Sequence, residues 1–173
     1  NFESRGEIGA AVCVYQDGKK VVDLWGGYKD TARTVPWAED TIVIMNSVAK
    51  SLCALCTHIL VDRGQVDFDA PVARYWPEFA QAGKGGVLVR HVLSHTCGVI
   101  YCDAAPPGSW FDWNTHVRAI EQQEPPWEPG TKGAYNSINI GWILGEIVRR
   151  VTGQSVGTFL REEVSGRLGA DYQ

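Results

Sequence analysis

The sequence predicts an α+β protein in which an antiparallel hairpin comes first and helices follow. Two β-prone runs, at residues 9–15 and 20–26, flank a Gln-Asp-Gly-Lys segment at 16–19. Asp-Gly between two such runs is a strong hairpin signal. From residue 47 onward, apolar residues recur at helical spacing instead. Strands and helices do not alternate as they do around a parallel α/β sheet, so that fold class is not expected.

The overall composition is that of a globular protein. The 173 residues suffice for one ordinary domain or for one lobe of a larger protein. The net charge of −4 gives no reason to expect nucleic acid or an anionic membrane as a partner. No apolar run approaches the roughly 18 residues that are needed to span a bilayer. We therefore expect one compact unit that acts on a small molecule.

The five cysteines bear on the cellular compartment. Their odd number and their scatter through apolar segments argue against a disulfide framework and favour free thiols in a reducing environment. The first residues, NFESRGEIG, are polar and contain no signal-peptide core. These two observations favour a cytoplasmic location.

The clearest element after the hairpin is a helix at 47–63. Gly64 suits the position after a helix end, where the backbone turns left-handed. The apolar run at 41–46 before the helix reads as a short strand. Asp69 is expected to cap a short helix that runs through Trp76. Further helices are predicted at 88–96, 113–122, 137–152 and 155–168.

A long loop region at 101–130 is rich in proline and tryptophan. Loops of this length within a compact domain are often functional. Its tryptophans either wall a pocket or pack in the core, and the sequence leaves both possibilities open. They are Trp110, Trp113 and Trp127.

Ser47-x-x-Lys50 is the first motif that could carry chemistry. Residues three apart lie on one face of a helix, so the lysine can reach the serine hydroxyl. A helix N-terminus also favours developing negative charge. A serine needs a base to become a nucleophile, and a lysine can serve if burial or another cation lowers its pKa. The alternative is a serine that caps the helix beside a solvated lysine.

Tyr135-Asn136-Ser137 is the second motif, at the entry to the helix at 137–152. Beside an amine, a phenol can shuttle protons because positive charge stabilises its anion. A packing role for Tyr135 is the alternative.

Two further patterns are predicted to be structural. Gly153-x-Ser155-x-Gly157 matches the nucleophile elbow of α/β-hydrolases, but a helix enters it where that motif requires a strand. Ser155 is therefore expected to cap the next helix. The pairs Cys53/Cys56 and His91/His95 have metal-ligand spacings without the rest of a metal motif, so His95 is expected to be a hydrogen-bonded structural residue. No metal or cofactor is expected.

The order of these motifs resembles that of the serine β-lactamase and penicillin-binding-protein superfamily. The class C-type serine hydrolases, including the family VIII esterases, are the most similar. The resemblance rests on the DG hairpin and LWGG, then SVAK, LVDRGQVDFDAPVARYWPEF, VRHVLSHTCGV, WEPGTKGAYNS and GWILGEIVRRVTG. It implies a β-lactamase/transpeptidase-like fold, in which helices flank an antiparallel sheet and form a second, mostly helical lobe.

The resemblance also implies residue roles. Ser47 would be the acylated nucleophile, Lys50 its base and Tyr135 the proton relay, with the Ser47 N–H as one oxyanion donor. Ser137 would lie at a substrate-binding position where β-lactamases of this class carry Asn. This departure favours hydrolysis of a small carboxylic ester. The alternatives are a β-lactamase, a D-aminopeptidase or related amidase, an acyltransferase, and an inactive ligand-binding homologue.

The resemblance implies a division of the chain as well. Residues 1–46 would hold the hairpin and lead-in of the α/β part, and residues 47–168 the mostly helical part with both motifs. Residues 169–173 would begin a connection to a C-terminal part that carries the third motif and further strands. Because a lone hairpin is marginally stable, we expect a complementary C-terminal segment or chain to complete the fold.

Overall fold

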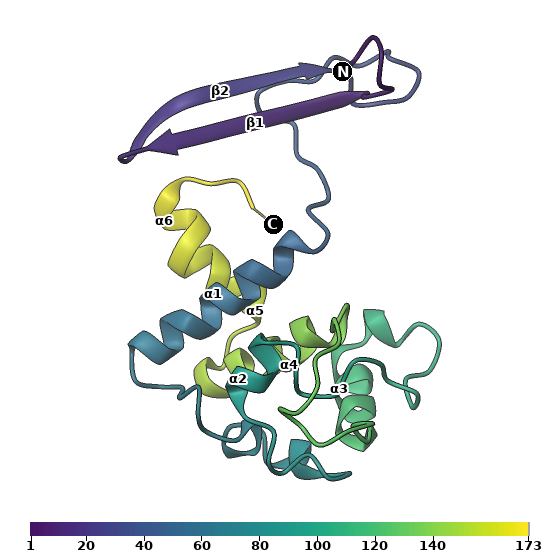
Figure 1. The fold of residues 1–173 in the computed structure, drawn as a ribbon. Helices are drawn as coiled ribbons and strands as arrows, with labels where there is room; N and C mark the ends of the chain where they lie inside the picture. The colour runs from purple at the N-terminus through teal and green to yellow at the C-terminus, as the bar shows by residue number, and fades with distance from the viewer. Residues whose placement is uncertain (173) are drawn as a thin grey trace. The chain divides into compact units, whose positions relative to one another are not determined.

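The computed structural model describes residues 1–172, which form two compact units. The first unit is Asn1–Ile44, and the second begins at Met45 and continues to the end of the chain (Figure 1). The predicted α+β class is thus correct, with the strands in the first unit and the helices in the second. Within residues 1–172, no helix combines the length and the apolar character that crossing a bilayer requires.

The first unit is built on an antiparallel hairpin of β1 (Gly9–Gln16) and β2 (Lys19–Gly27). Asp17 and Gly18 both have positive φ, 50° and 74°, which is the conformation of a type I′ turn. This turn follows the right-handed twist of the strands and explains the Asp-Gly signal. The predicted hairpin is therefore confirmed.

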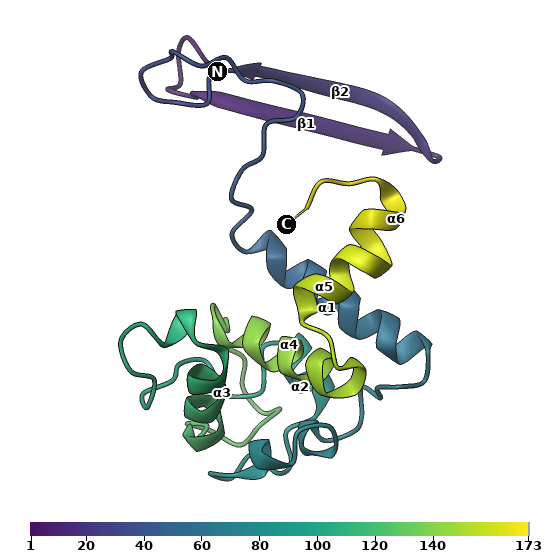
Figure 2. The same cartoon turned by 180° about the vertical axis from the view of Figure 1, so that it is seen from behind.

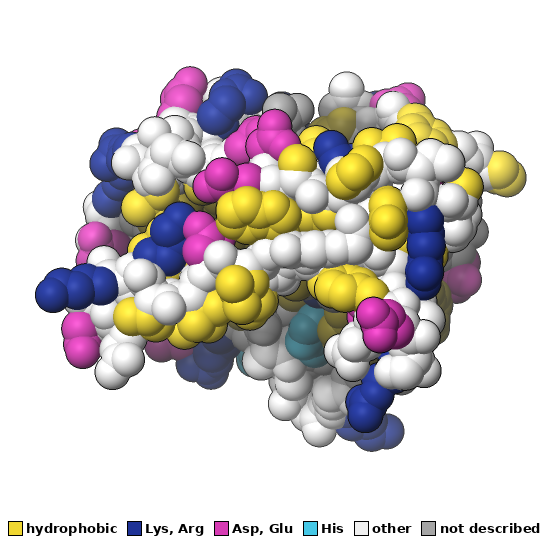
Figure 3. Space-filling view, turned by 90° about the horizontal axis from the view of Figure 1, so that it is seen from above, with side chains coloured by type: hydrophobic (Ala, Val, Ile, Leu, Met, Phe, Trp, Pro, Cys, Tyr) yellow, Lys and Arg dark blue, Asp and Glu magenta, His cyan; other side chains and the backbone are white. Residues whose placement is uncertain are grey.

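The hairpin leaves much of its apolar surface uncovered within its own unit. Val12 and Leu24 are register partners on one face, and they are 50% and 63% exposed. Trp25 on the opposite face is also exposed. Figure 3 shows hydrophobic side chains along the hairpin when the molecule is seen from above. Contiguous exposed apolar surface of this kind is typical of a surface that another segment covers.

The second unit is helical, and short turns connect its helices. The α-helices are α1 (Val48–Asp62), α2 (Val89–Leu93), α3 (Trp113–Gln122), α4 (Asn139–Thr152), α5 (Val156–Leu160) and α6 (Gly166–Leu168). The 3-10 turns are η1 (Val72–Arg74), η2 (Pro77–Ala80) and η3 (Ser109–Phe111), and a π-helical turn, η4 (Arg161–Ser165), joins α5 to α6.

Helix α4 lies at the centre of the core of this unit. It packs against α1, α2, α3 and α5, and Figures 1 and 2 show it between α1 and α3. Its apolar face is fully buried and meets buried residues of α1. The core residues of the two helices are Ile143, Leu144, Ile147 and Val148 from α4, and Cys56 and Leu60 from α1. Gly153 ends α4 with φ 76°, as the sequence predicts.

A buried carboxylate on α4 bonds two arginines of the same helix and one side chain of α3. Glu146 is inaccessible to solvent and accepts hydrogen bonds from Arg149, Arg150 and the Trp113 indole. Burial alone raises the pKa of this carboxyl, but the hydrogen bonds outweigh burial and hold the pKa below its ordinary value. Trp113 is thus partly buried, packs against the core and lies on Trp142.

Several predicted elements are corrected by the structure. The run at 41–46 is irregular, so Ser47 does not lie at a strand-to-helix junction. Asp69 caps no helix, because it pairs with Arg90, and the short helix that it was expected to open is only the 3-10 turn η1. The helix predicted at 155–168 is interrupted by η4. The helix predicted at 88–96 is shortened to α2.

Candidate active site

Ser47 stands at the entry to α1, but its hydroxyl does not cap the helix. Its own backbone is already helical, with φ −68° and ψ −12°, whereas a capping residue has an extended backbone that turns the side chain back to the first amides. The first amides instead donate to carbonyls three residues back, beginning with Val48 N–H to the Met45 carbonyl at 3.1 Å. The capping alternative for Ser47 is therefore wrong.

The Ser47 hydroxyl is bonded by two side chains instead. The Lys50 ammonium donates to Ser47 Oγ at 3.2 Å, and the Tyr135 hydroxyl donates to the same oxygen at 2.9 Å. The Lys50 Nζ also lies 5.1 Å from the centre of the Tyr135 ring. The fold thus brings together the two predicted motifs, which are 88 residues apart in the sequence.

The electrostatics of this cluster favour loss of a proton from the phenol. The pKa of Tyr135 lies below its ordinary value, first because Ser47 hydrogen-bonds the phenol oxygen and second because the Lys50 ammonium lies beside it. Once deprotonated, the Tyr135 oxygen can accept from the Ser47 hydroxyl and lies beside the Lys50 ammonium, and both contacts then stabilise the phenolate relative to the phenol. Tyr135 is 57% exposed, so this cluster is accessible from solvent.

His95 holds the backbone on both sides of Tyr135. Its carbonyl accepts from Ala134 N–H at 3.1 Å, and its Nδ1 accepts from Asn136 N–H at 3.0 Å. The His95 and Tyr135 rings also lie 5.0 Å apart, centre to centre. The expectation that His95 is a hydrogen-bonded structural residue is confirmed, and the contacts show that the residue it fixes is Tyr135.

Asn136, the middle residue of the second motif, faces the core. Its side chain is fully buried, donates to the Val99 carbonyl at 2.9 Å and accepts from Ile140 N–H at 2.9 Å. The second bond satisfies one of the amides that the first turn of α4 leaves unpaired. Ser137 is exposed, and within residues 1–172 no side-chain hydrogen bond to it is found. The structural role of Asn136 was not predicted from the sequence, although an Asn shortly before an apolar helical run is a usable signal.

The other polar patterns have structural partners. Ser155 Oγ accepts from Thr158 N–H at 3.1 Å and so caps α5, as predicted from the entering helix. His91 Nδ1 accepts from Leu88 N–H at 3.3 Å. All five cysteines are free, as expected from the sequence; Cys56 and Cys97 are buried, and Cys13 is exposed. Among residues 1–172, no group of three or more His, Cys, Asp or Glu side chains is arranged to hold a metal ion.

Comparison with known proteins identifies the family. Residues 1–171 match the family model described as Beta-lactamase. The chain belongs to this family. The resemblance inferred from the order of the motifs is thereby confirmed.

Individual relatives add detail on esterases. The chain is 37% identical to the esterase/beta-lactamase LipL of Mycobacterium tuberculosis over 98% of its own length. Among solved structures, it matches a family VIII carboxylesterase with a TM-score of 0.93 and 39% identity over 98% of the chain. It also matches a penicillin-binding-protein homologue from Caulobacter crescentus with a TM-score of 0.92 and 40% identity over 98% of the chain.

These relatives are much longer than the chain. The chain spans 39% of LipL, 47% of the carboxylesterase chain and 46% of the Caulobacter chain. The fold is therefore that of β-lactamase and penicillin-binding-protein relatives over the portion that is matched.

Proposed function

We propose that the protein to which this chain belongs hydrolyses carboxylic esters through an acyl-enzyme on Ser47. The observation that carries the proposal is the position of Ser47 Oγ, which receives hydrogen bonds from both Lys50 and Tyr135 at 3.2 and 2.9 Å. A serine hydroxyl becomes a nucleophile when a base lies within hydrogen-bond reach, and the Tyr135 oxygen, once deprotonated, is such a base. The names of the esterase relatives point to the same chemistry.

The proposed reaction has two steps. Ser47 Oγ attacks the ester carbonyl carbon while its proton passes to the Tyr135 phenolate, which the Lys50 ammonium stabilises, and a tetrahedral oxyanion forms. The carbonyl reforms, the C–O bond to the alcohol breaks, and the alcohol takes up the proton. Water then attacks the acyl-enzyme with the same phenolate as base, which releases the acid and restores the Ser47 hydroxyl. An alcohol in place of water would make the reaction an acyl transfer.

Tyr135 is the better placed of the two groups to move the proton. Its hydroxyl makes the shorter contact with Ser47 Oγ, and its pKa is lowered by Ser47 and by Lys50. The nearby ammonium stabilises the phenolate that accepts the proton. We therefore assign proton relay to Tyr135 and electrostatic support of the phenolate to Lys50, which also positions the hydroxyl.

The Ser47 N–H is available to the oxyanion in this proposal. The backbone bonds of the turn begin with the amide of Val48, so the Ser47 amide is not used to build the helix. A backbone amide beside the nucleophile is one of the two donors that an oxyanion hole requires.

An ester suits the site better than a β-lactam. Ser137 occupies the position where β-lactamases of this class carry an amide side chain, and the adjacent Asn136 cannot substitute because its side chain is buried on the Val99 carbonyl. A site without that amide loses a polar contact to the β-lactam side chain, whereas a simple ester presents no group that needs it. Hydrolysis of β-lactams or other amides is the second candidate, which the name of LipL keeps open.

The test compares two substrates on the full-length protein. We expect turnover of p-nitrophenyl butyrate, little turnover of nitrocefin, and an acyl or phosphonate adduct on Ser47 by mass spectrometry. Ser47→Ala should abolish both the turnover and the adduct. Absence of any adduct at Ser47 and of turnover on either substrate would refute the hydrolase, and rapid nitrocefin turnover would replace the esterase by a β-lactamase.

We also propose that a C-terminal segment or separate chain pairs with the β1–β2 hairpin. The exposed faces around Val12, Leu24 and Trp25 and the short span relative to the relatives support this proposal. Expression of residues 1–173 alone should give a poorly folded, inactive product, measured by circular dichroism and ester turnover. A monomeric, cooperatively folded and active product would refute it.

A further inference from the structure

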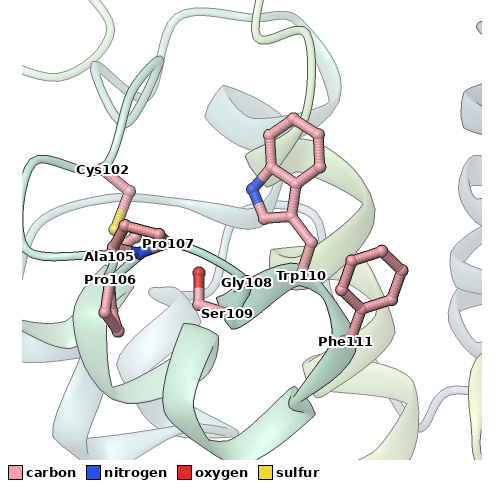
Figure 4. A pocket seen from close by; sticks show the side chains of 8 residues that line it. All are labelled: Cys102, Ala105, Pro106, Pro107, Gly108, Ser109, Trp110 and Phe111. Carbon is pink, nitrogen blue, oxygen red and sulfur yellow. The ribbon is translucent and has the colours of Figure 1, made fainter.

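A second feature of the helical unit is lined by none of Ser47, Lys50 and Tyr135. An open pocket of about 440 Å³ is lined by Cys102 and by residues 105–111, a segment that includes the 3-10 turn η3. Figure 4 shows Cys102 and the two prolines on one side, Trp110 and Phe111 on the other, and the Ser109 hydroxyl between them. Pockets of roughly 300–1,000 Å³ are the usual size for small-molecule sites.

The rim of this pocket is aromatic and is not part of the core. Trp110 is 61% exposed and Phe111 is 96% exposed. Exposing two adjacent aromatic side chains forgoes the free energy that their burial would contribute, and aromatic rings contribute some of the largest buried areas. The rim is therefore suited to stacking on an apolar partner. Of the tryptophans expected to wall a pocket or pack in the core, Trp110 lines this pocket.

The floor of the pocket is rigidly tied to the core. Ser109 and His116 are buried, with Ser109 Oγ 3.0 Å from His116 Nδ1 and His116 Nε2 3.2 Å from Asn139 Oδ1. The amide nitrogen of Asn139 donates to the Val99 and Tyr101 carbonyls. Asn139 Oδ1 must then accept, so His116 carries its proton on Nε2 and its Nδ1 accepts from the Ser109 hydroxyl. The Ser109 hydroxyl proton is thus already used in the hydrogen bond to His116 Nδ1.

The same hydrogen bonds connect the pocket to the candidate active site. The Val99 carbonyl accepts from both Asn139 and Asn136, and Asn136 directly follows Tyr135. Tyr101, whose carbonyl Asn139 also holds, directly precedes the first pocket residue, Cys102. One buried polar network therefore fixes the wall of the pocket and the backbone beside Tyr135.

The chemistry of the lining selects the ligand. None of the side chains that line the pocket carries a formal charge, and burial raises the pKa of the Cys102 thiol, which keeps it protonated at neutral pH. Because the Ser109 hydroxyl already donates to His116, it has no proton to donate to a polar ligand. Such a lining disfavours a carboxylate, because an anion placed there would lose hydration without gaining a charged partner.

We propose that this pocket binds a bulky apolar group of the ester substrate, an aromatic ring above all, with Trp110 and Phe111 as its specificity residues. The proposal rests on the proposed ester hydrolase function and names the substrate class that it would favour. The bulky group could belong to the acyl or to the alcohol part of the ester, and the experiment separates the two.

The test uses the full-length enzyme with Trp110→Ala and Phe111→Ala, and three neutral esters. They are ethyl acetate, 1-naphthyl acetate with its bulky alcohol, and ethyl phenylacetate with its bulky acyl group. We expect kcat/KM to fall about tenfold or more for at least one bulky ester and to stay within about twofold for ethyl acetate. The ester that responds identifies the part of the substrate that the pocket holds. An equal fall for all three esters, or no fall for either bulky ester, overturns the proposal.

Two controls separate this proposal from the proposed function. Leu168→Ala removes another exposed apolar side chain of the same unit, outside the pocket, and should alter none of the three rates. Binding of 1-naphthol to the Ser47→Ala enzyme, followed by NMR, requires no catalysis and should weaken on adding Trp110→Ala. If esters are not cleaved but Trp110→Ala weakens 1-naphthol binding, the proposed hydrolase function is refuted and the proposed ligand pocket is supported. If esters are cleaved but Trp110→Ala leaves 1-naphthol binding unchanged, only the proposed ligand pocket is refuted.

Discussion

Ser47 and Ser155 both stand at the first turn of a helix, yet the structure uses them in opposite ways. Ser155 has an extended backbone, with φ −64° and ψ 152°, and its hydroxyl accepts from Thr158 N–H to cap α5. Ser47 has a helical backbone and leaves the amides of α1 to backbone carbonyls. Its hydroxyl oxygen instead accepts hydrogen bonds from Lys50 and Tyr135.

The difference lies in one backbone dihedral rather than in the motif around each serine. An extended ψ directs the side chain of an N-cap residue toward the amides of the following turn. A helical ψ turns the side chain away from those amides, and the hydroxyl remains available to other partners. Gly-x-Ser-x-Gly, the better-known nucleophile pattern, thus marks a cap here, whereas the less conspicuous Ser-x-x-Lys marks the candidate nucleophile.

The largest expected effect separates the two serines by activity. Ser47→Ala should lower kcat for p-nitrophenyl butyrate by about 10⁴-fold or more, because the nucleophile is lost. Ser155→Ala, the matched control, should keep nearly full activity because its hydroxyl serves the helix end. Steady-state kinetics on both purified variants measure this. A folded Ser155→Ala enzyme without activity would reverse the comparison and restore the elbow interpretation.

The partners of Ser47 should show the next largest effect. Tyr135→Phe removes the proton relay and should lower kcat by about 10²- to 10⁴-fold, the usual contribution of general acid–base catalysis. Lys50→Met should lower kcat by a factor in the same range. A Tyr135→Phe enzyme with unchanged kcat would show that the phenol only packs beside the serine.

The pH response of Tyr135 distinguishes the two partners further. The hydrogen bond with Ser47 and the neighbouring Lys50 ammonium both lower the pKa of this phenol. Removing the ammonium in Lys50→Met therefore raises the pKa, and the phenolate should form at higher pH than in the wild type. Ultraviolet difference titration against Tyr135→Phe isolates this one tyrosine from the others. Titration at the same pH in the wild type and in Lys50→Met would remove Lys50 from its assigned role.

Parts of the fold and of the site could be predicted from local sequence. The Asp-Gly turn and the glycine after α4 each require a left-handed backbone, which few residues other than Gly, Asn and Asp adopt readily. The helical spacing around α1 and α4 reflects a buried face of each helix. Signals of this kind depend on a few consecutive residues, so a single sequence suffices to detect them.

Other features depend on contacts between distant residues, and local sequence could not give them. The meeting of Tyr135 with Ser47 followed only from the resemblance, since no spacing rule connects residues 88 positions apart. The π-helical turn η4 and the role of Asp69 were mispredicted. In the second case, the turn η1 begins only at Val72, and the Asp69 carboxylate pairs with Arg90 instead of capping it.

His95 should show a smaller effect, through position rather than chemistry. His95→Asn keeps a residue that tolerates the positive φ of 60° but removes the ring beside Tyr135 and the Nδ1 that holds Asn136 N–H. We expect kcat to fall about tenfold with KM little changed, because the misplaced phenol weakens the reaction more than binding. His91→Ala, in the helix α2 that precedes His95, is the control and should have little effect on kcat. Equal losses in both variants would indicate general destabilisation instead.

The smallest expected effect is on stability, and it returns to the two serines. Ser155→Ala removes the cap of α5 and should lower the free energy of unfolding by about 1 kcal/mol. Ser47→Ala removes no helix cap and should change it by no more than about 0.5 kcal/mol. Urea denaturation of the full-length variants, followed by circular dichroism, measures both values. A cost for Ser47→Ala as large as that for Ser155→Ala would mean that the Ser47 hydroxyl stabilises α1 after all. Loss of stability without loss of activity in Ser155→Ala, and loss of activity without loss of stability in Ser47→Ala, would therefore distinguish the helix-capping serine from the nucleophile most clearly.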